Sequence, residues 1–185
     1  SFAEYVVVPA SGAVVIPDEM PLDRAALISC AVLTGYGAVM NTAKVKPGST
    51  VAIFGCGGVG LNIVQGARMA GATTIIAVDV TQEKLDLAKK VGATHVINGA
   101  TSDPVAMVKE ICGGVDYAFE ALGRESTIQQ AWGTVGVDGT LILVGLMKNG
   151  ATITLDAGPF VNEQSIKGCY FGSANLRKDV PALVK

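Results

Sequence analysis

The chain has 185 residues, of which 50% are hydrophobic and 16% are charged, and its formal net charge is −2. This length and hydrophobic content are enough to bury the core of one domain, with or without part of another, and they exclude a disordered polypeptide. The small net charge gives no electrostatic support for binding nucleic acid or an anionic membrane surface. Four cysteines, at positions 30, 56, 112 and 169, include no C-x-x-C pair. That spacing predicts reduced thiols in a cytoplasmic protein rather than a disulfide framework or a self-contained structural zinc site.

The first quarter of the chain predicts two strands followed by two helices. Residues 5–8 and 13–16 are short apolar runs separated by a Pro-Ala-Ser-Gly turn, which favours a pair of strands. A helical pattern begins at Leu22. A second helix is expected from about Tyr36 to Ala43, and the Lys-Pro-Gly sequence at residues 46–48 ends it.

Two stretches without charged residues, 25–43 and 47–67, approach the length of a membrane span. Both are interrupted by Gly, Asn and either Thr or Gln, so they are interpreted as core segments of a globular fold. The opening "SFAEYVVVP" lacks the basic start and long apolar core of a signal peptide. Because no Met precedes a segment that already reads as a strand inside a domain, the chain is expected to be an excerpt of a longer protein.

From residue 50 onward, apolar strands alternate with amphipathic helices. The predicted strands cover residues 50–54, 74–78, 95–97, 115–119 and 140–144, with an edge strand at 151–155 and a last strand at 165–171. The predicted helices cover residues 59–70, 81–90, 104–112 and about 126–135, with Thr81 and Asp103 as N-caps and Gly92 and Gly113 beyond the ends. Apolar strands joined by helices indicate an α/β fold with a doubly wound parallel sheet, covered on both faces.

A glycine-rich turn, "GCGGVG" at residues 55–60, follows the first of these strands. The G-x-G-x-x-G pattern is weak by itself in a chain with 23 glycines, but here it lies between a strand and a helix, as in a dinucleotide-binding loop. In that interpretation Gly55 permits the tight turn, Gly57 lets the backbone approach a pyrophosphate, and Gly60 lets the helix pack closely. Gly58 and Val59 would present N–H groups and the positive helix end to the diphosphate.

An acidic residue ends the next strand at a suitable distance. Asp79 lies 19 residues after Gly60, close to the roughly 20 residues of the dinucleotide fingerprint. Its carboxylate can accept hydrogen bonds from ribose hydroxyls and would repel a 2′-phosphate, so NAD is predicted over NADP. Two alternatives are a glycine turn that only packs strand against helix, and a methyltransferase. The latter usually carries an acid on the first strand, where this chain has "VAIF".

Three segments together resemble one family. "SCAVLTGYGAVMNTAKVKPGSTVAIFGCGGVG", "VDVTQEKLDLAKKVGATHVIN" and "GVDYAFEALG" are similar to the zinc-containing alcohol dehydrogenases of the medium-chain dehydrogenase/reductase superfamily. The resemblance extends over essentially the whole chain, and C-x-x-x-T-G-Y-G before the glycine loop is quite specific. It implies a Rossmann fold with strand order 3-2-1-4-5-6 in residues 32–185. Residues 1–31 would be a remnant of the barrel-like, GroES-like catalytic domain.

The resemblance also implies roles for individual residues. Cys30 would be one protein ligand of a catalytic zinc, and Thr34 would line the nicotinamide pocket. The remaining cofactor residues that it implies are Gly55, Gly57, Gly58, Val59 and Gly60 at the pyrophosphate, Asp79 and Lys84 at the adenosine ribose, Leu122 and Arg124 beside the adenine, and Val144, Leu146, Cys169 and Phe171 at the carboxamide. Lys84 can equally be a solvated helix residue, and Arg124 a surface cap. Cys56 is interpreted as inert, and His95 as a residue of an exposed turn.

The family takes its other zinc ligands and its proton-relay hydroxyl from segments that this chain lacks. No catalytic residue is therefore assigned, and the 185 residues are expected to bind NAD without turnover. The implied full-length enzyme oxidises a small alcohol to an aldehyde or ketone by hydride transfer to NAD. It would be a homodimer or homotetramer paired through sheet edges. The alternatives are a zinc-free NAD(P)H-dependent reductase of the same superfamily, which usually lacks a cysteine at position 30, and a nucleotide-sensing domain without chemistry.

Overall fold

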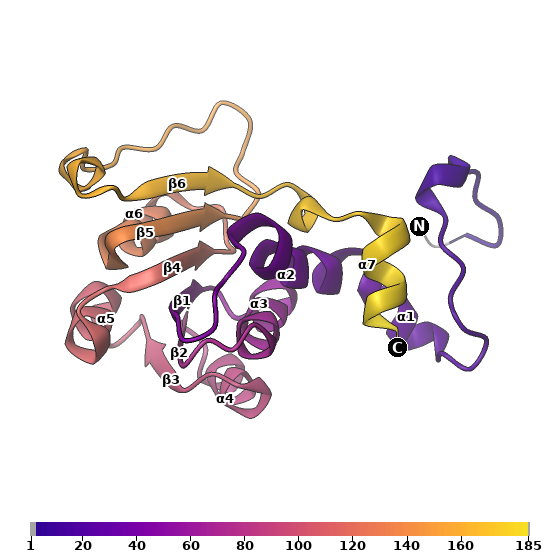
Figure 1. The fold of residues 1–185 in the computed structure, drawn as a ribbon, viewed down its shortest axis with the longest axis horizontal. Coiled ribbons are helices and arrows are strands. Elements are labelled where there is room, and N and C mark those ends of the chain that lie inside the picture. The colour runs from indigo at the N-terminus through magenta and orange to yellow at the C-terminus, as the bar shows by residue number, and fades with distance from the viewer. Residues whose placement is uncertain (1–2, 185) are drawn as a thin grey trace.

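The computed structural model describes residues 3–184 and contains one six-stranded parallel sheet (Figure 1). Its strand order is β3-β2-β1-β4-β5-β6, so the chain starts in the middle of the sheet, moves to one edge and then crosses to the other. This confirms the predicted doubly wound α/β fold. The strands are β1 Thr50–Phe54, β2 Thr74–Asp79, β3 His95–Asn98, β4 Val115–Glu120, β5 Val135–Leu143 and β6 Ser165–Gly168.

Helices cover both faces of the sheet because strand side chains alternate between the faces. On β1, Val51 and Ile53 belong to the core cluster shared with α3 and α4, whereas Ala52 and Phe54 belong to the cluster shared with α5 and α6. All four of these residues are at most 1% exposed. The helices are α3 Gly58–Met69, α4 Gln82–Val91, α5 Pro104–Cys112 and α6 Glu125–Thr134.

The helix ends agree with most of the predicted signals. The Asp103 carboxylate accepts hydrogen bonds from the N–H groups of Val105 (2.9 Å) and Ala106 (3.4 Å), which caps α5. Gly92 and Gly113 follow α4 and α5 with φ values of 132° and 76°, where residues with a side chain are strained. Thr81 occupies the predicted N-cap position of α4 with extended backbone angles, but its side chain makes no capping hydrogen bond.

One continuous helical segment replaces the two helices predicted before the sheet. It runs through α1 Leu22–Leu27, the wide turn η2 Ile28–Val32, α2 Leu33–Gly37 and the wide turn η3 Ala38–Ala43. Within the described residues, this is one helix whose length and composition would allow it to cross a membrane.

That helical segment packs against α3 as a core helix. A Cβ on Gly35 would lie 2.5 Å from the Cβ of Asn62 and 2.6 Å from the carbonyl oxygen of Val59, so the contact requires glycine. The segment continues through residue 31, and the predicted domain boundary at that point stays a prediction.

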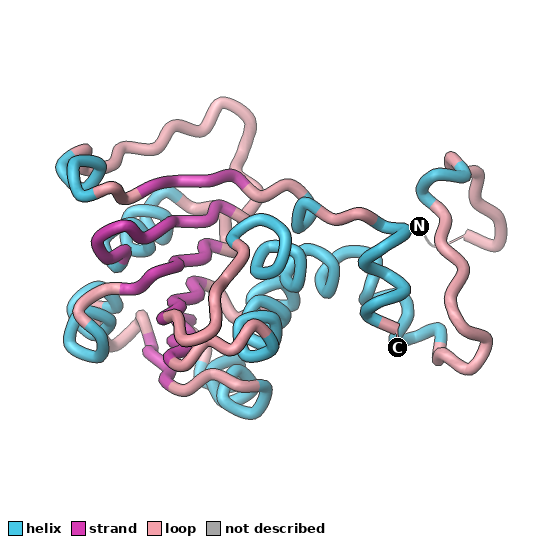
Figure 2. Tube along the Cα trace, in the orientation of Figure 1, coloured by secondary structure: helices cyan, strands magenta, loops and turns pink. Residues whose placement is uncertain are grey.

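Three of the predicted strands are not strands in the structure. Residues 5–8 and 13–16 form no strand and flank the short 3₁₀ turn η1 Ala10–Gly12, and residues 151–155 are an irregular loop (Figure 2). None of the three pairs with a neighbouring strand, so their backbone groups lack the ladder that defines a strand. The described sheet edges are therefore β3 and β6, not the predicted edge strand at 151–155.

Smaller differences concern the ends of the last elements. β5 begins at Val135 rather than at residue 140, and β6 ends at Gly168 rather than at residue 171. The chain after β6 forms the short turn η5 Phe171–Ser173, whose three residues all have positive φ, and then α7 Leu176–Leu183. The turn η4 Gly158–Asn162 lies between β5 and β6.

Candidate functional site

The glycine loop, residues 55–60, joins the carboxyl end of β1 to the start of α3. Gly55 has a φ of +96°, and a Cβ on Gly60 would lie only 1.7 Å from the carbonyl oxygen of Gly55. Both glycines are therefore required by the turn itself. Gly57 differs, because its φ is −77° and a Cβ there would meet no protein atom within 4 Å. The missing side chain of Gly57 leaves open space outside the protein surface, where a ligand can approach the backbone.

The start of α3 points at this open space. Gly58, Val59 and Gly60 are its first residues, and the first N–H groups of an α-helix have no partner within the helix. These N–H groups, together with the positive end of the helix dipole, form a site that suits a phosphate group.

Asp79 lies beside the loop at the end of β2. Its carboxylate accepts hydrogen bonds from the N–H groups of Cys56 (2.7 Å) and Thr81 (3.0 Å), and the Lys84 ammonium is 3.9 Å away. Asp79 is only 8% exposed. Its carboxylate therefore connects the glycine loop to the start of α4, and it still faces a cavity through which a ribose can reach it.

That cavity, here called the Asp79 cavity, measures about 350 Å³. Five of the predicted cofactor residues line it: Gly55, Asp79, Lys84, Leu122 and Arg124. Sequence reasoning missed its polar residues Ser126, Thr127 and Gln130, which come from α6. The signal for them was their position at the start of the helix after β4, because that turn lies at the carboxyl edge of a parallel sheet.

A second cavity of about 370 Å³, here called the Cys30 cavity, lies beyond the loop. Its lining contains eight of the predicted residues: Cys30, Thr34, Val59, Leu122, Val144, Leu146, Cys169 and Phe171. Tyr170, which sequence reasoning missed, lies at this cavity and is 89% exposed. Leu122 lines both cavities, so the two are adjacent and extend from the two sides of the glycine loop.

Cys30 lies in η2 with an exposed side chain. A catalytic zinc needs three protein ligands and an open position. Within residues 3–184 no three His, Cys, Asp or Glu side chains come together in a group that could hold a metal ion. The assignment of Cys30 as one zinc ligand therefore stays a prediction.

Cys56 and His95, which were not assigned to the site, line neither of these two cavities. Burial raises the pKa of the Cys56 thiol from 9.0 to about 12, the charge of Asp79 adds to the increase, and Lys84 opposes it. The thiol stays neutral at physiological pH and is inert, as expected. His95 is exposed at the start of β3, where a ring nitrogen forms a hydrogen bond with the hydroxyl of Thr94 (2.9 Å).

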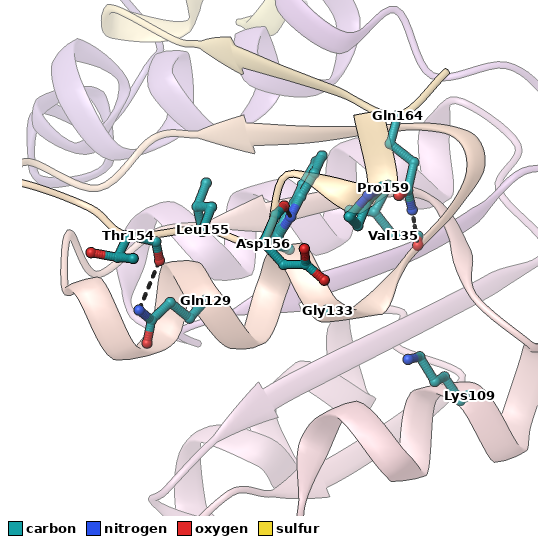
Figure 3. A pocket seen from close by; sticks show the side chains of 10 residues that line it. Lys109, Gln129, Gly133, Val135, Thr154, Leu155, Asp156, Pro159 and Gln164 are labelled. Atoms are coloured by element: carbon teal, nitrogen blue, oxygen red, sulfur yellow. Dashed lines mark hydrogen bonds between the residues drawn. The ribbon is translucent and has the colours of Figure 1, made fainter. Parts of the chain in front are cut away.

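A larger cavity, about 490 Å³, lies near the start of β5, far from the glycine loop in sequence (Figure 3). Two of its polar side chains have protein partners: the indole N–H of Trp132 donates to the carbonyl of Asp156 (2.9 Å), and Gln129 donates to the carbonyl of Thr154 (2.8 Å). None of the predicted site residues lines it. In sheets of this type ligands bind at the carboxyl ends of the strands, which favours the other two cavities.

The strand order 3-2-1-4-5-6, with helices on both faces of the sheet, defines an α/β domain of the Rossmann type. The sequence matches the model of the zinc-binding dehydrogenase family over residues 58–185, and the chain belongs to that family. Among curated proteins, alcohol dehydrogenase-like 1 from Arabidopsis thaliana is 41% identical, over all of this chain and 49% of the relative.

Solved structures of dehydrogenases are similar to this chain in both fold and sequence. The crystal structure of benzyl alcohol dehydrogenase from Acinetobacter calcoaceticus has a TM-score of 0.89 and 38% identity, over 91% of this chain and 47% of that one. A zinc-binding dehydrogenase from Sinorhizobium meliloti, bound to NADP, has a TM-score of 0.69 and 30% identity, over 76% of this chain and 42% of that one. This chain thus spans about half the length of the proteins that it matches.

Proposed function

We propose that this chain is the NAD-binding part of a zinc-dependent alcohol dehydrogenase. The observation that carries the proposal is the buried carboxylate of Asp79, held against the glycine loop at the wall of a cavity large enough for an adenosine. The family membership supports a dehydrogenase, and the similarity to proteins named as alcohol dehydrogenases supports an alcohol as the substrate.

In the proposed complex, the residues of this chain bind and orient the coenzyme. The adenosine enters the Asp79 cavity, the N–H groups at the start of α3 bind the diphosphate, and the nicotinamide enters the Cys30 cavity. NAD, when bound, supplies the carbon that accepts a hydride from the alcohol. The Cys30 cavity, where the nicotinamide would lie, has mainly apolar walls, among them the buried Val144.

The Cys30 thiol lines the same cavity as the proposed nicotinamide site, which supports its assignment as one zinc ligand. The remaining ligands would come from outside this chain, so the proposal covers the longer protein of which these residues form about half. Metal analysis of that longer protein tests this point: one catalytic zinc per subunit, lost in Cys30→Ser, is expected, and a zinc-free active enzyme would favour the reductase alternative.

The preference for NAD over NADP follows from charge. A 2′-phosphate about 4 Å from the Asp79 carboxylate would cost on the order of 4 kcal/mol per charge pair at an effective dielectric constant of 20. Lys84, whose side chain is 49% exposed, offsets part of that repulsion. The similar NADP-bound structure shows that a relative accepts the phosphate, so the preference needs a direct measurement.

Calorimetric titration of NAD and NADP into wild-type protein and Asp79→Gly is that measurement. We expect the wild type to bind NAD more tightly and the variant to lose most of this preference. Asp79→Asn is the companion variant, because it removes the charge, leaves a side chain of the same size and keeps one of the two backbone hydrogen bonds of the carboxylate. An unchanged preference in both variants would show that Asp79 does not select the coenzyme.

A further inference from the structure

The carboxylate of Glu120, at the end of β4, is fully buried, with an exposed fraction of 0%. One of its oxygens accepts hydrogen bonds from the N–H groups of Leu122 (3.0 Å) and Gly123 (2.9 Å) and from the hydroxyl of Thr127 (2.7 Å). The other oxygen lies 3.0 Å from the same N–H of Gly123. A buried charge is costly unless it is fully hydrogen-bonded, and here the partners are the residues of the turn between β4 and α6.

These partners belong to the walls of the proposed coenzyme site. Leu122 lines both cavities, and a Cβ on Gly55 would lie 2.8 Å from its side chain, so Leu122 packs directly against the glycine loop. Thr127 lines the Asp79 cavity. By holding the N–H of Leu122, the Glu120 carboxylate fixes the wall at which the two cavities meet.

Glu120 also contacts the turn that follows β5, mainly through its backbone carbonyl and at Gly145 through its carboxylate. The backbone carbonyl of Glu120 accepts hydrogen bonds from the N–H groups of Val144 and Gly145, both at 2.9 Å. A Cβ on Gly145 would lie 2.7 Å from a carboxylate oxygen of Glu120 and 2.1 Å from the nitrogen of Gly123. Val144 and Gly145 line the Cys30 cavity. Glu120 therefore lies where the turn after β4, which lines the Asp79 cavity, packs against the turn after β5, which lines the Cys30 cavity.

We propose that Glu120 is a positioning residue that keeps the two cavities at the separation that one dinucleotide requires. This proposal rests on the coenzyme binding proposed above. A dinucleotide occupies both cavities through one covalent linker, so its affinity depends on the relative placement of the cavities, whereas that of a mononucleotide in one cavity does not. Glu120 would thus act on NAD through Leu122 and Gly145 without touching it.

Glu120→Gln tests this with little change in shape. Its amide nitrogen would replace one carboxylate oxygen and face the N–H of Gly123, so two donors would oppose each other and the turn would move. Titrations with AMP, which fills the Asp79 cavity alone, and with NAD should separate the two effects. AMP should bind less tightly to the extent that Leu122 and Thr127 move in the wall of the Asp79 cavity, but the dissociation constant for NAD should rise by about tenfold more than that for AMP.

The ratio of the two dissociation constants distinguishes positioning from simple loss of stability. A variant that is only partly folded binds AMP and NAD less tightly by the same factor, so the ratio would not change. Glu110→Gln is the matched control, because it removes the same charge from an exposed site on α5 and should leave both constants unchanged. If Glu120→Gln does not fold, Thr127→Val removes the hydroxyl that donates to the Glu120 carboxylate (2.7 Å) and keeps the side-chain shape, and it should lower the preference for NAD over AMP in the same direction.

A wild-type protein that binds no NAD would overturn the proposed function. A wild type that binds NAD, combined with an unchanged ratio in Glu120→Gln or, if that variant does not fold, in Thr127→Val, would overturn only the role of Glu120.

Discussion

The central sheet and the segment before it, residues 3–21, contain similar apolar runs but differ in what surrounds them. Val51 and Ile53 on β1 are fully buried between two neighbouring strands and the helices of one face, whereas Tyr5 is 90% and Val7 101% exposed. Both runs have the composition of a strand, yet only one becomes a strand. The difference shows that an apolar β pattern produces a strand only where neighbouring strands take up its backbone hydrogen bonds.

The largest effect that would sharpen this comparison is expected at Gly60. In Gly60→Ala the new methyl group would lie 1.7 Å from the carbonyl oxygen of Gly55, so the turn between β1 and α3 has to open. We expect a loss of about 4 kcal/mol or more in the free energy of unfolding, measured by urea denaturation. No single substitution in residues 3–21 should approach this value.

Gly57→Ala is the matched control in the same loop. Its Cβ would have no protein atom within 4 Å, so stability should change by less than about 0.5 kcal/mol. NAD binding should nevertheless weaken, because the methyl group occupies the space proposed for the pyrophosphate. Equal stability losses in the two variants would contradict the distinction between a glycine that the fold needs and one that the ligand needs.

A smaller but still large effect is expected from Ile53→Ala in the core. The side chain is fully buried between β1 and the helices of one face, and its removal leaves a cavity. The expected cost is about 2–5 kcal/mol of unfolding free energy, measured by urea or thermal denaturation. A cost below about 0.5 kcal/mol, the value expected for an exposed substitution, would contradict the burial of Ile53 in the core.

Burial of Cys56 predicts a dependence of stability on pH. Its pKa is raised from 9.0 to about 12 in the folded protein, so between these values the unfolded chain loses a proton that the folded chain keeps. Its contribution to stability is therefore complete below pH 9 and is lost as the pH rises toward 12. Denaturation at several pH values should show a steeper alkaline decline of the unfolding free energy in the wild type than in Cys56→Ala.

The difference in exposure between two cysteines predicts a difference in their reactivity. In the native wild type, a thiol reagent should modify the exposed Cys30 well before Cys56.

The smallest effect is expected from Val7→Ser in the segment before the sheet. The side chain is fully exposed, so its replacement should change the unfolding free energy by less than about 0.5 kcal/mol. Thermal denaturation of this chain checks the value. A loss comparable to that of Ile53→Ala would break the comparison, since it would mean that Val7 contributes to the core.

The sequence by itself determined the elements whose signals are local. The strand–loop–helix order around residues 50–70, Asp103 as a helix cap and Gly92 beyond a helix end depend on residues near one another in the chain, and the structure agrees with each. The spacing of 19 residues from Gly60 predicts Asp79 at the glycine loop, and the parallel pairing of β1 with β2 brings the two together in the structure. These features follow from short-range geometry and from one topological rule.

The tertiary structure decided what depends on partners distant in the chain. The apolar runs at 5–8, 13–16 and 151–155 satisfy the local pattern of a strand, but none of them pairs with a strand of the described sheet. The residues within each run do not indicate whether such a pairing partner exists. The buried carboxylate of Glu120 and the position of Leu122 between two cavities likewise arise only when β4, β5 and the glycine loop meet. Backbone hydrogen bonds between strands and the burial of charge are properties of such assembled contacts, so only the folded chain determines them.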